Sequence, residues 1–263
     1  METLRRQQSA RMSKRLPIRT RWVVIGVLAV VYIVLVSQNQ LWEHVLSSLF
    51  PDESQVLHPR ADLLTLVLQH TMLIAISSTL TVAIGIPLGI FVTRDVGRPF
   101  LPITSDLTAL GQTFPPVAVL ALAVPIMGFG LEPTILALFL YGLLPVVRNT
   151  ISGLLAVPKD TREAAHGRGM TGWQGLARVE VPLAAPVILA GIRTSVIINV
   201  GTAMIGAVIG AGGLGSPIVA GLIQDNLAFV IEGAVPAAML ALLLDQTLAG
   251  LVKQFPEQQL SQA

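Results

Sequence analysis

Residues 63–92 read LLTLVLQHTMLIAISSTLTVAIGIPLGIFV and contain no Asp, Glu, Lys or Arg over thirty positions. About 20 such residues are enough for an α-helix to cross the hydrocarbon core of a bilayer. An open strand would leave its backbone N–H and C=O groups without partners in lipid, whereas a helix pairs them internally. This stretch therefore predicts a membrane-spanning helix.

The rest of the chain has the same character. Of its 263 residues, 53% are hydrophobic and only 12% are charged, whereas a soluble domain usually carries about 25% charged residues. Five more apolar runs have the character of spans: 22–36, 100–127, 133–147, 182–209 and 227–252. The first of these lacks a following small-x-small cleavage site, so we interpret it as a retained anchor rather than a signal peptide. We predict an all-α integral membrane protein with six transmembrane helices.

The basic residues predict how these spans are oriented. Fifteen of the seventeen Lys and Arg lie in alternate connecting segments: seven in 1–21, two in 93–99, five in 148–181 and one after residue 252. Cytoplasmic loops are enriched in Lys and Arg, so we expect a multi-pass membrane protein with both termini in the cytoplasm. We divide the chain into a cytoplasmic basic arm (1–21), an anchor helix with a periplasmic loop (22–61), a transmembrane domain (62–255) and a cytoplasmic tail (256–263).

Glycines and prolines indicate where spans touch or bend. Gly85 and Gly89, like Gly206 and Gly210, have the small-xxx-small spacing that lets two helices approach closely. Prolines within the spans should kink or break them: Pro87, Pro115, Pro116, Pro125 and Pro145.

Cofactor and metal sites are not indicated. The chain has no cysteine, and its four histidines show no ligand spacing. Residues 210–215, GAGGLG, match a dinucleotide-binding pattern, but they follow an apolar helix instead of a strand, so we expect a turn. A phosphate-binding GxxxxGK[ST] loop is also missing from the sequence, which predicts that any ATP is bound by a partner.

The longest basic loop carries the most informative pattern. Asp160 and Glu163 have the spacing of a helix-starting capping box, and glycines at 167 and 169 should end that helix. Thr171 and Gln174 repeat the capping spacing. We therefore predict two short helices that present small residues to the groove of a partner protein.

This loop resembles the signature of permeases of bacterial ABC importers. Glu163-Ala164-Ala165 is followed at the family's spacing by Gly169 and by Val179-Glu180-Val181-Pro182, with Val replacing Ile and Leu. The resemblance implies a protein of the bacterial inner membrane with a type I ABC importer permease fold, in which Glu163, Ala164, Ala165, Gly169 and Pro182 belong to a cytoplasmic coupling helix. It also implies three kinds of partner: two ATP-binding subunits, a periplasmic solute-binding protein, and a second permease copy or homologue. Glu163 could instead merely cap its helix.

Three further segments, 111–117, 140–150 and 186–195, resemble the branch of the family that imports osmoprotectants such as glycine betaine and choline. The chain would then form the membrane pathway, while ATP hydrolysis belongs to a separate subunit. A permease for another small solute, such as an amino acid, is the alternative within the class. A membrane-embedded enzyme is disfavoured because no catalytic cluster is seen, and a scaffold would not require the loop pattern.

Ionisable residues within spans are costly unless they are paired or hydrated. Asp106, Arg193, Glu232 and Asp245 are such residues, and each is interpreted as part of an ion pair or of a pathway. Phe114, Tyr141 and Asp245 are the candidate pathway or gate residues. Aromatic residues make up only 5% of the chain. Since quaternary ammonium ligands are usually held by aromatic cages, we expect the high-affinity site to lie in the binding protein.

Overall fold

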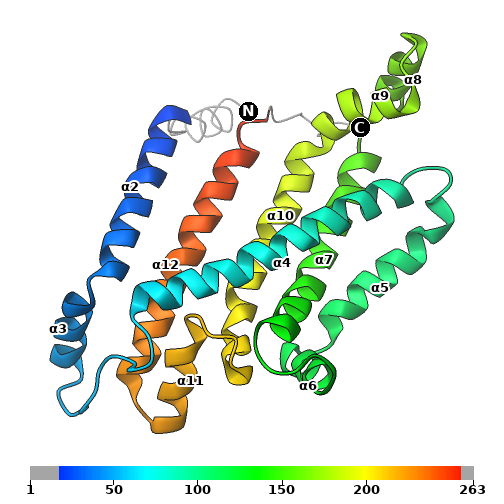
Figure 1. Ribbon diagram of the computed structural model, residues 1–263. Coiled ribbons are helices and arrows are strands. Elements are labelled where there is room, and N and C mark those ends of the chain that lie inside the picture. The colour runs from blue at the N-terminus through cyan, green and yellow to red at the C-terminus, as the bar shows by residue number, and fades with distance from the viewer. Residues whose placement is uncertain (1–17, 256–263) are drawn as a thin grey trace, which may run out of the picture.

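The computed structural model describes residues 18–255, all of whose regular elements are helices (Figure 1). Five of these helical segments are long and apolar enough to cross a membrane. Those five segments are α2 (Ile18–Ser37), α4 (Leu63–Val92), α7 (Leu131–Leu155), the stretch Gly172–Ile209 that contains α10 (Val181–Ala203), and α12 (Leu227–Val252). The predicted basic arm before residue 18, with Arg5, Arg6, Arg11, Lys14 and Arg15, lies outside the described residues, as does the tail 256–263.

The third predicted span is a bent pair of helices rather than one helix. α5 (Leu101–Thr113) and α6 (Pro116–Met127) meet at 94°. Phe114 and Pro115 between them are extended, with ψ of 135° and 141°, because a residue that precedes proline is pushed away from helical geometry. The bend lies at Pro115 and Pro116, two of the prolines that were expected to kink or break a span. Counted as one broken span, the pair gives the predicted total of six.

Two more helices lie in segments that we expected to be loops. α3 (Asn39–Leu49) follows α2 directly, and it buries Trp42 and Leu46 while its other side is polar or exposed. α11 (Gly215–Gln224) precedes α12. The glycines from 210 to 213 form the predicted turn, since Gly210, Gly212 and Gly213 all have φ near +80°.

Hydrogen bonds fasten the N-terminal unit, residues 18–62, to α12 and to its N-cap residue Asn226. The Tyr32 hydroxyl donates to the Pro236 carbonyl at 3.2 Å, and the Asn226 side chain donates to the Gln55 carbonyl at 2.8 Å. The His58 backbone N–H donates to the buried Glu232 carboxylate at 2.8 Å. The partner of Glu232 is thus a backbone amide, whereas the sequence analysis interpreted this residue as part of an ion pair or of a pathway.

The centre of the bundle is the contact of α4, α7 and α10. A Cβ atom added at Gly89 of α4 would lie 2.7 Å from Thr150 of α7, and one at Gly191 of α10 would lie 2.5 Å from Asn149 Cβ. At Gly142 of α7 an added Cβ would lie 2.5 Å from the Ser195 hydroxyl. Each distance is shorter than two carbon or oxygen atoms tolerate, so these helices touch only because the glycines lack side chains.

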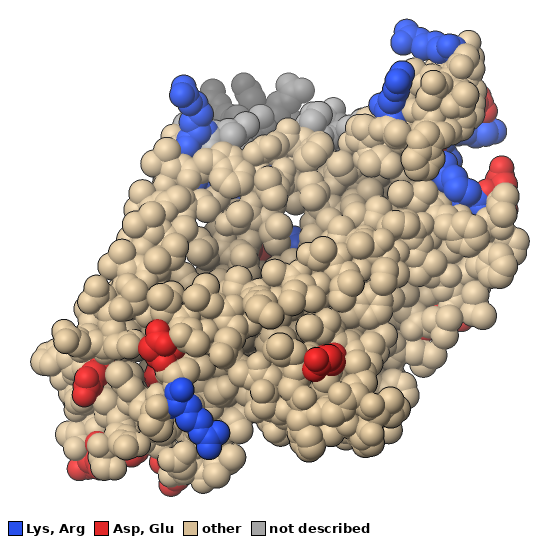
Figure 2. Space-filling model, in the orientation of Figure 1, with Lys and Arg blue, Asp and Glu red and all other residues tan. Residues whose placement is uncertain are grey.

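Basic side chains mark one end of the molecule. On the face shown in Figure 2, Lys and Arg gather where α8 (Lys159–Gly167) and α9 (Gly172–Gly175) project, and Asp and Glu lie mainly at the other end. We call the first of these the basic end. It holds residues 93–99 and the loop 156–180 (Figure 1).

The close contact at Gly191 predicts a large difference between two substitutions in the same helix. Gly191→Ala should destabilise the protein by about 1–3 kcal/mol, because the new methyl group forces α7 and α10 apart. Gly201→Ala is the matched control, since no atom lies within 4 Å of the new Cβ, and it should be neutral or slightly stabilising. The midpoint of thermal unfolding in detergent measures both, and equal midpoints would contradict the proposed packing.

Candidate functional site

The loop 156–180, which we call the signature loop, stands out from the helical body at the basic end (Figure 1). It contains α8 and α9 and then the π-helix η3 (Leu176–Glu180), which leads into α10. α7 enters the loop at its other side. The loop is therefore continuous with two of the three helices of the central contact.

The start of α8 differs from the prediction. Pro158 occupies the N-cap position without a side-chain cap, and the helix begins at Lys159. Asp160 thus lies inside the first turn, where a carboxylate suits the positive end of the helix dipole, and it does not cap the helix. Glu163 lies 3.4 Å from the Lys159 ammonium, with 64% of its side chain exposed. An exposed pair like this adds little stability, so the Glu163 carboxylate is available to a partner.

The end of α8 explains why the signature has a glycine at 169. Met170 N–H donates to the Ala165 carbonyl at 3.2 Å, and Gly169 N–H donates to the His166 carbonyl at 2.9 Å. These two bonds form a Schellman motif, whose C′ residue must be left-handed. Gly169 occupies that position with φ of +79°. The predicted stop after residue 167 is confirmed.

The second helix starts as the sequence predicts. Thr171 Oγ1 accepts from Gln174 N–H at 3.3 Å, and Gln174 Oε1 accepts from Thr171 N–H at 3.0 Å, which completes a capping box. The loop is thus held by local hydrogen bonds at both of its turns. It also presents Trp173, which is 74% exposed. An exposed tryptophan is typical of a protein interface, and sequence reasoning overlooked it although it lies within the signature.

The other signature residues differ in exposure. Ala164 is exposed beside Glu163, whereas Ala165 is 7% exposed and packs inward. Pro182 lies in the first turn of α10 and is exposed. Glu163, Ala164 and Trp173 are therefore exposed on the loop, while Ala165 and Gly169 shape it.

Two of the three candidate pathway residues lie together at the break between α5 and α6. The Tyr141 hydroxyl of α7 donates to the Phe114 carbonyl, and the Gln112 side chain donates to the Tyr141 carbonyl at 2.7 Å. Phe114 itself is 51% exposed. The bent pair is therefore held against α7 at its corner, and a pathway role for Phe114 and Tyr141 stays a prediction.

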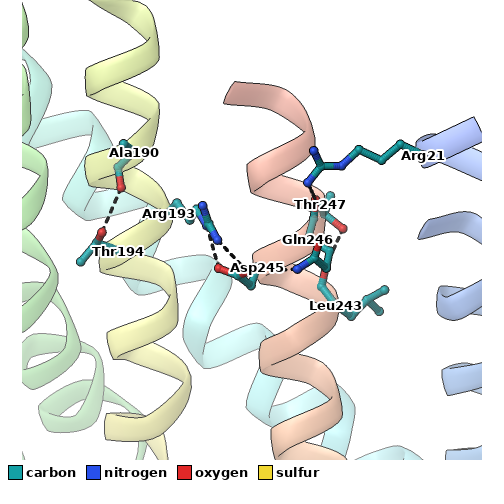
Figure 3. A network of polar contacts seen from close by, with 8 residues as sticks. All are labelled: Arg21, Ala190, Arg193, Thr194, Leu243, Asp245, Gln246 and Thr247. Carbon is teal, nitrogen blue, oxygen red and sulfur yellow. Dashed lines mark hydrogen bonds and ion pairs between the residues drawn. The ribbon is translucent and has the colours of Figure 1, made fainter. Parts of the chain in front are cut away.

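Asp245, the third candidate, lies on α12 and is paired with Arg193 of α10 (Figure 3). Arg193 Nε donates to one carboxylate oxygen at 2.7 Å and Nη2 donates to the other at 2.8 Å. Such a bidentate pair is strong and directional. Gln246 Nε2 also lies 3.4 Å from Asp245, and Arg21 of α2 lies 3.5 Å from the Gln246 carbonyl. The geometry makes a structural tie between helices the simpler role, and the gate stays a prediction.

The chain matches the protein family described as binding-protein-dependent transport system inner membrane component over residues 85–255. The osmoprotectant import permease protein OsmY of Salmonella typhimurium is 46% identical over 190 residues, which cover 72% of this chain and 80% of that protein. The choline transport system permease protein OpuBB of Bacillus subtilis is 40% identical over 188 residues, covering 72% and 86%.

Solved structures show the same fold. A chain of the MetNI methionine ABC transporter, in an inward-facing conformation, has a TM-score of 0.67 at 23% identity and covers 74% of this chain and 96% of that one. A chain of an amino acid ABC transporter has a TM-score of 0.56 at 20% identity, covering 73% and 91%. The predicted fold class is confirmed.

The chain therefore belongs to the inner membrane components of binding-protein-dependent transport systems. It is the permease of an ABC importer and not an enzyme, since ATP is hydrolysed by a separate subunit in such systems. The assignment to a multi-pass inner-membrane protein is confirmed by the same family match and by the apolar helices.

The Schellman motif predicts that Gly169 is required for the shape of the loop. Gly169→Ala should cost about 1–2 kcal/mol locally, because a residue with a Cβ is strained in the left-handed region. Hydrogen exchange at the amides of residues 168–171 should speed up by about tenfold, since 1.4 kcal/mol is a factor of ten. Gly167→Ala is the control, as that glycine is helical with open space around it. Equal exchange in both variants would contradict this explanation of Gly169.

The bidentate pair in Figure 3 predicts that two substitutions together are milder than one. Arg193→Leu should destabilise the protein by about 1–3 kcal/mol, because Asp245 then loses both charged hydrogen bonds. Arg193→Leu with Asp245→Leu should recover at least half of that loss, since no lone charge remains. Thermal unfolding in detergent measures both. A double variant no more stable than the single one would contradict a structural tie.

Proposed function

We propose that this permease forms the membrane pathway for an osmoprotectant of the quaternary ammonium class, such as glycine betaine or choline. The observation that carries the proposal is the 40–46% identity to permeases named for osmoprotectant and choline transport, over about 70% of the chain. The three segments that resemble this branch, 111–117, 140–150 and 186–195, lie at the α5–α6 break, in α7 and in α10. α7 and α10 belong to the central contact, and the α5–α6 break is held against α7.

We propose further that the basic end faces the cytoplasm, so that both termini are cytoplasmic and the signature loop meets the ATPase. The distribution of fifteen of the seventeen Lys and Arg supports this orientation. Glu163 and Trp173 would contact a groove of the ATP-binding subunit, with Ala165 and Gly169 shaping the helix pair that enters it. Exposure of Glu163 and Trp173 supports the docking role.

A second permease, either another copy or a homologue, would complete the pathway. The bent pair α5–α6 presents an apolar surface that includes Ile103, Leu107, Phe114 and Ile126, of which Ile126 is 86% exposed. Lipid could cover such a surface, but the polar corner at Phe114 and Tyr141 is better suited to a protein partner around a hydrated pathway. Two ATP-binding subunits would then dock on two signature loops, and a solute-binding protein would deliver the solute at the opposite end.

Transport then follows from a rigid-body switch. ATP binding would close the ATPase pair and move the signature loops. Because each loop is continuous with α7 and α10, that motion would reach the central contact and open the pathway toward the binding protein. Hydrolysis would reset it.

The test is uptake of radiolabelled glycine betaine by bacteria that lack other betaine transporters and carry the complete transport operon. Deletion of this permease should abolish uptake. Glu163→Arg should reduce uptake at least tenfold, because it replaces a negative charge at the docking surface by a positive one. Lys159→Ala is the matched control, because it breaks the same surface pair but keeps the carboxylate. Immunoblots verify that every component is expressed.

The competitors separate the remaining possibilities. Unlabelled choline or carnitine should reduce betaine uptake if the solute class is correct. If betaine uptake does not need this permease but uptake of methionine or another amino acid does, the transported solute is an amino acid and not an osmoprotectant. Intact uptake and intact ATPase docking in Glu163→Arg would contradict the docking role of the loop.

A further inference from the structure

A partly buried ion pair joins the signature loop to α4, the one central helix with which the loop is not continuous. Arg94 follows the end of α4, and Glu180 is the last residue of η3, 86 positions later in the chain. Arg94 Nη1 donates to Glu180 Oε1 at 3.0 Å, and Nη2 donates to Oε2 at 2.8 Å.

The pair is largely withdrawn from water. The Glu180 side chain is 8% exposed and the Arg94 side chain is 33% exposed. Arg94 Nη2 also lies 3.3 Å from the Thr93 hydroxyl. A bidentate, charge-assisted pair with one buried member has a fixed geometry and resists separation. Loss of one member would leave a charge without its partner in a poorly hydrated site.

The backbone on the α4 side holds Arg94 firmly. Gly97 N–H and Arg98 N–H both donate to the Arg94 carbonyl, at 3.0 and 2.8 Å. A Cβ atom at Gly97 would lie 2.1 Å from the Phe91 carbonyl oxygen, so the chain turns back directly onto the end of α4. The guanidinium therefore extends from a tight turn and not from a loose loop.

Apolar packing lies next to the pair and connects the same elements. Leu154 of α7, Leu176 of η3 and Ile188 of α10 form a buried cluster, against which Ile86 and Ile90 of α4 pack. Apolar contacts permit sliding, because they have no preferred direction. The ion pair is the directional contact at this junction.

The two other ion pairs between described residues do not make this connection. Lys159–Glu163 lies within the signature loop and is exposed, and Arg193–Asp245 joins α10 to α12. η3 is itself a π-helix, a rare geometry that is frequently found at functional sites. Displacement of α9 must pass through η3 to reach α10, and Glu180 stands at the junction of the two.

We propose that Arg94–Glu180 is a strut that transmits the displacement of α8 and α9 into α4, so that all three central helices move together. Arg94 and Glu180 are positioning residues in this scheme, and they contact neither ATP nor solute. The proposal rests on the proposed function, in which the signature loop docks the ATPase. Without the strut, the loop would still move α7 and α10, but α4 would lag and ATP would be hydrolysed with little transport.

The experiment uses the complete transporter, reconstituted in liposomes, and measures solute transported per ATP hydrolysed. Arg94→Gln and Glu180→Gln should keep ATPase subunits bound during purification and keep ATP hydrolysis within about twofold of wild type. Transport per ATP should fall by about tenfold. The exchange Arg94→Glu with Glu180→Arg should restore at least half of the wild-type ratio. Arg98→Gln is the matched control, an exposed basic residue in the same turn, and should leave the ratio unchanged.

Arg94→Lys keeps the proposal testable if the neutral variants fold poorly. Lysine retains the charge but lacks the planar fork needed for a bidentate contact, so a folded protein with a several-fold lower ratio is expected. A wild-type ratio in Arg94→Lys and in either neutral variant would overturn the strut. So would an exchange variant that folds and docks the ATPase but stays uncoupled.

Docking is scored separately from coupling, which keeps the two proposals apart. If Glu163→Arg abolishes ATPase binding while Arg94→Gln transports with the normal ratio, the strut is wrong and the docking role stands. If Glu163→Arg leaves ATPase binding intact, the docking role is wrong and the strut loses its basis.

Discussion

The contact among α4, α7 and α10 is the interaction on which the rest of the structure depends. Lipid is as apolar as leucine, so helices in a membrane associate through close packing and hydrogen bonds and not through the hydrophobic effect. Here the packing brings helices to the limit of approach: a Cβ at Gly191 would lie 2.6 Å from the Pro145 carbonyl oxygen. The same contact encloses polar groups, since Asn199 of α10 donates to the Ser77 hydroxyl of α4 at 3.3 Å. Both terms act only at short range, so they hold the three helices side by side.

The connections of these helices determine where force from outside can enter. α7 leads into the signature loop and α10 leads out of it, so the loop is attached to the central contact at both of its ends. The backbone hydrogen bonds of the Schellman motif at Gly169 and the side-chain bonds of the capping box at Thr171 hold the turn between α8 and α9. A partner that displaced α8 would therefore move a rigid pair of helices, and the displacement would be delivered at η3.

The bounds of the straight spans could be predicted from the sequence, but the angle at which a broken span bends could not. Residues 63–92 and 227–252 are helical over the same bounds that their apolar runs predicted, because length and hydropathy are the quantities that a bilayer selects. Hydropathy carries no information about direction, so the 94° bend at Phe114 was visible only as two prolines. The first turn of α8 shows a different limit. Asp160 has the spacing of a cap, but Pro158 starts the helix earlier and moves Asp160 inside it.

Partners of buried charges were the least predictable feature, because the helices that touch decide them. Arg193 and Asp245 are 52 positions apart, and His58 and Glu232 are 174 apart. The partner of Glu232 is especially hard to predict, because it is a backbone N–H, a group that nearly every residue has. The bonds from Tyr32 and Asn226 likewise end on carbonyls. The N-terminal unit is thus fastened to α12 largely through backbone atoms. Such bonds constrain the path of the chain in space, but they place little constraint on which residues occupy the unit.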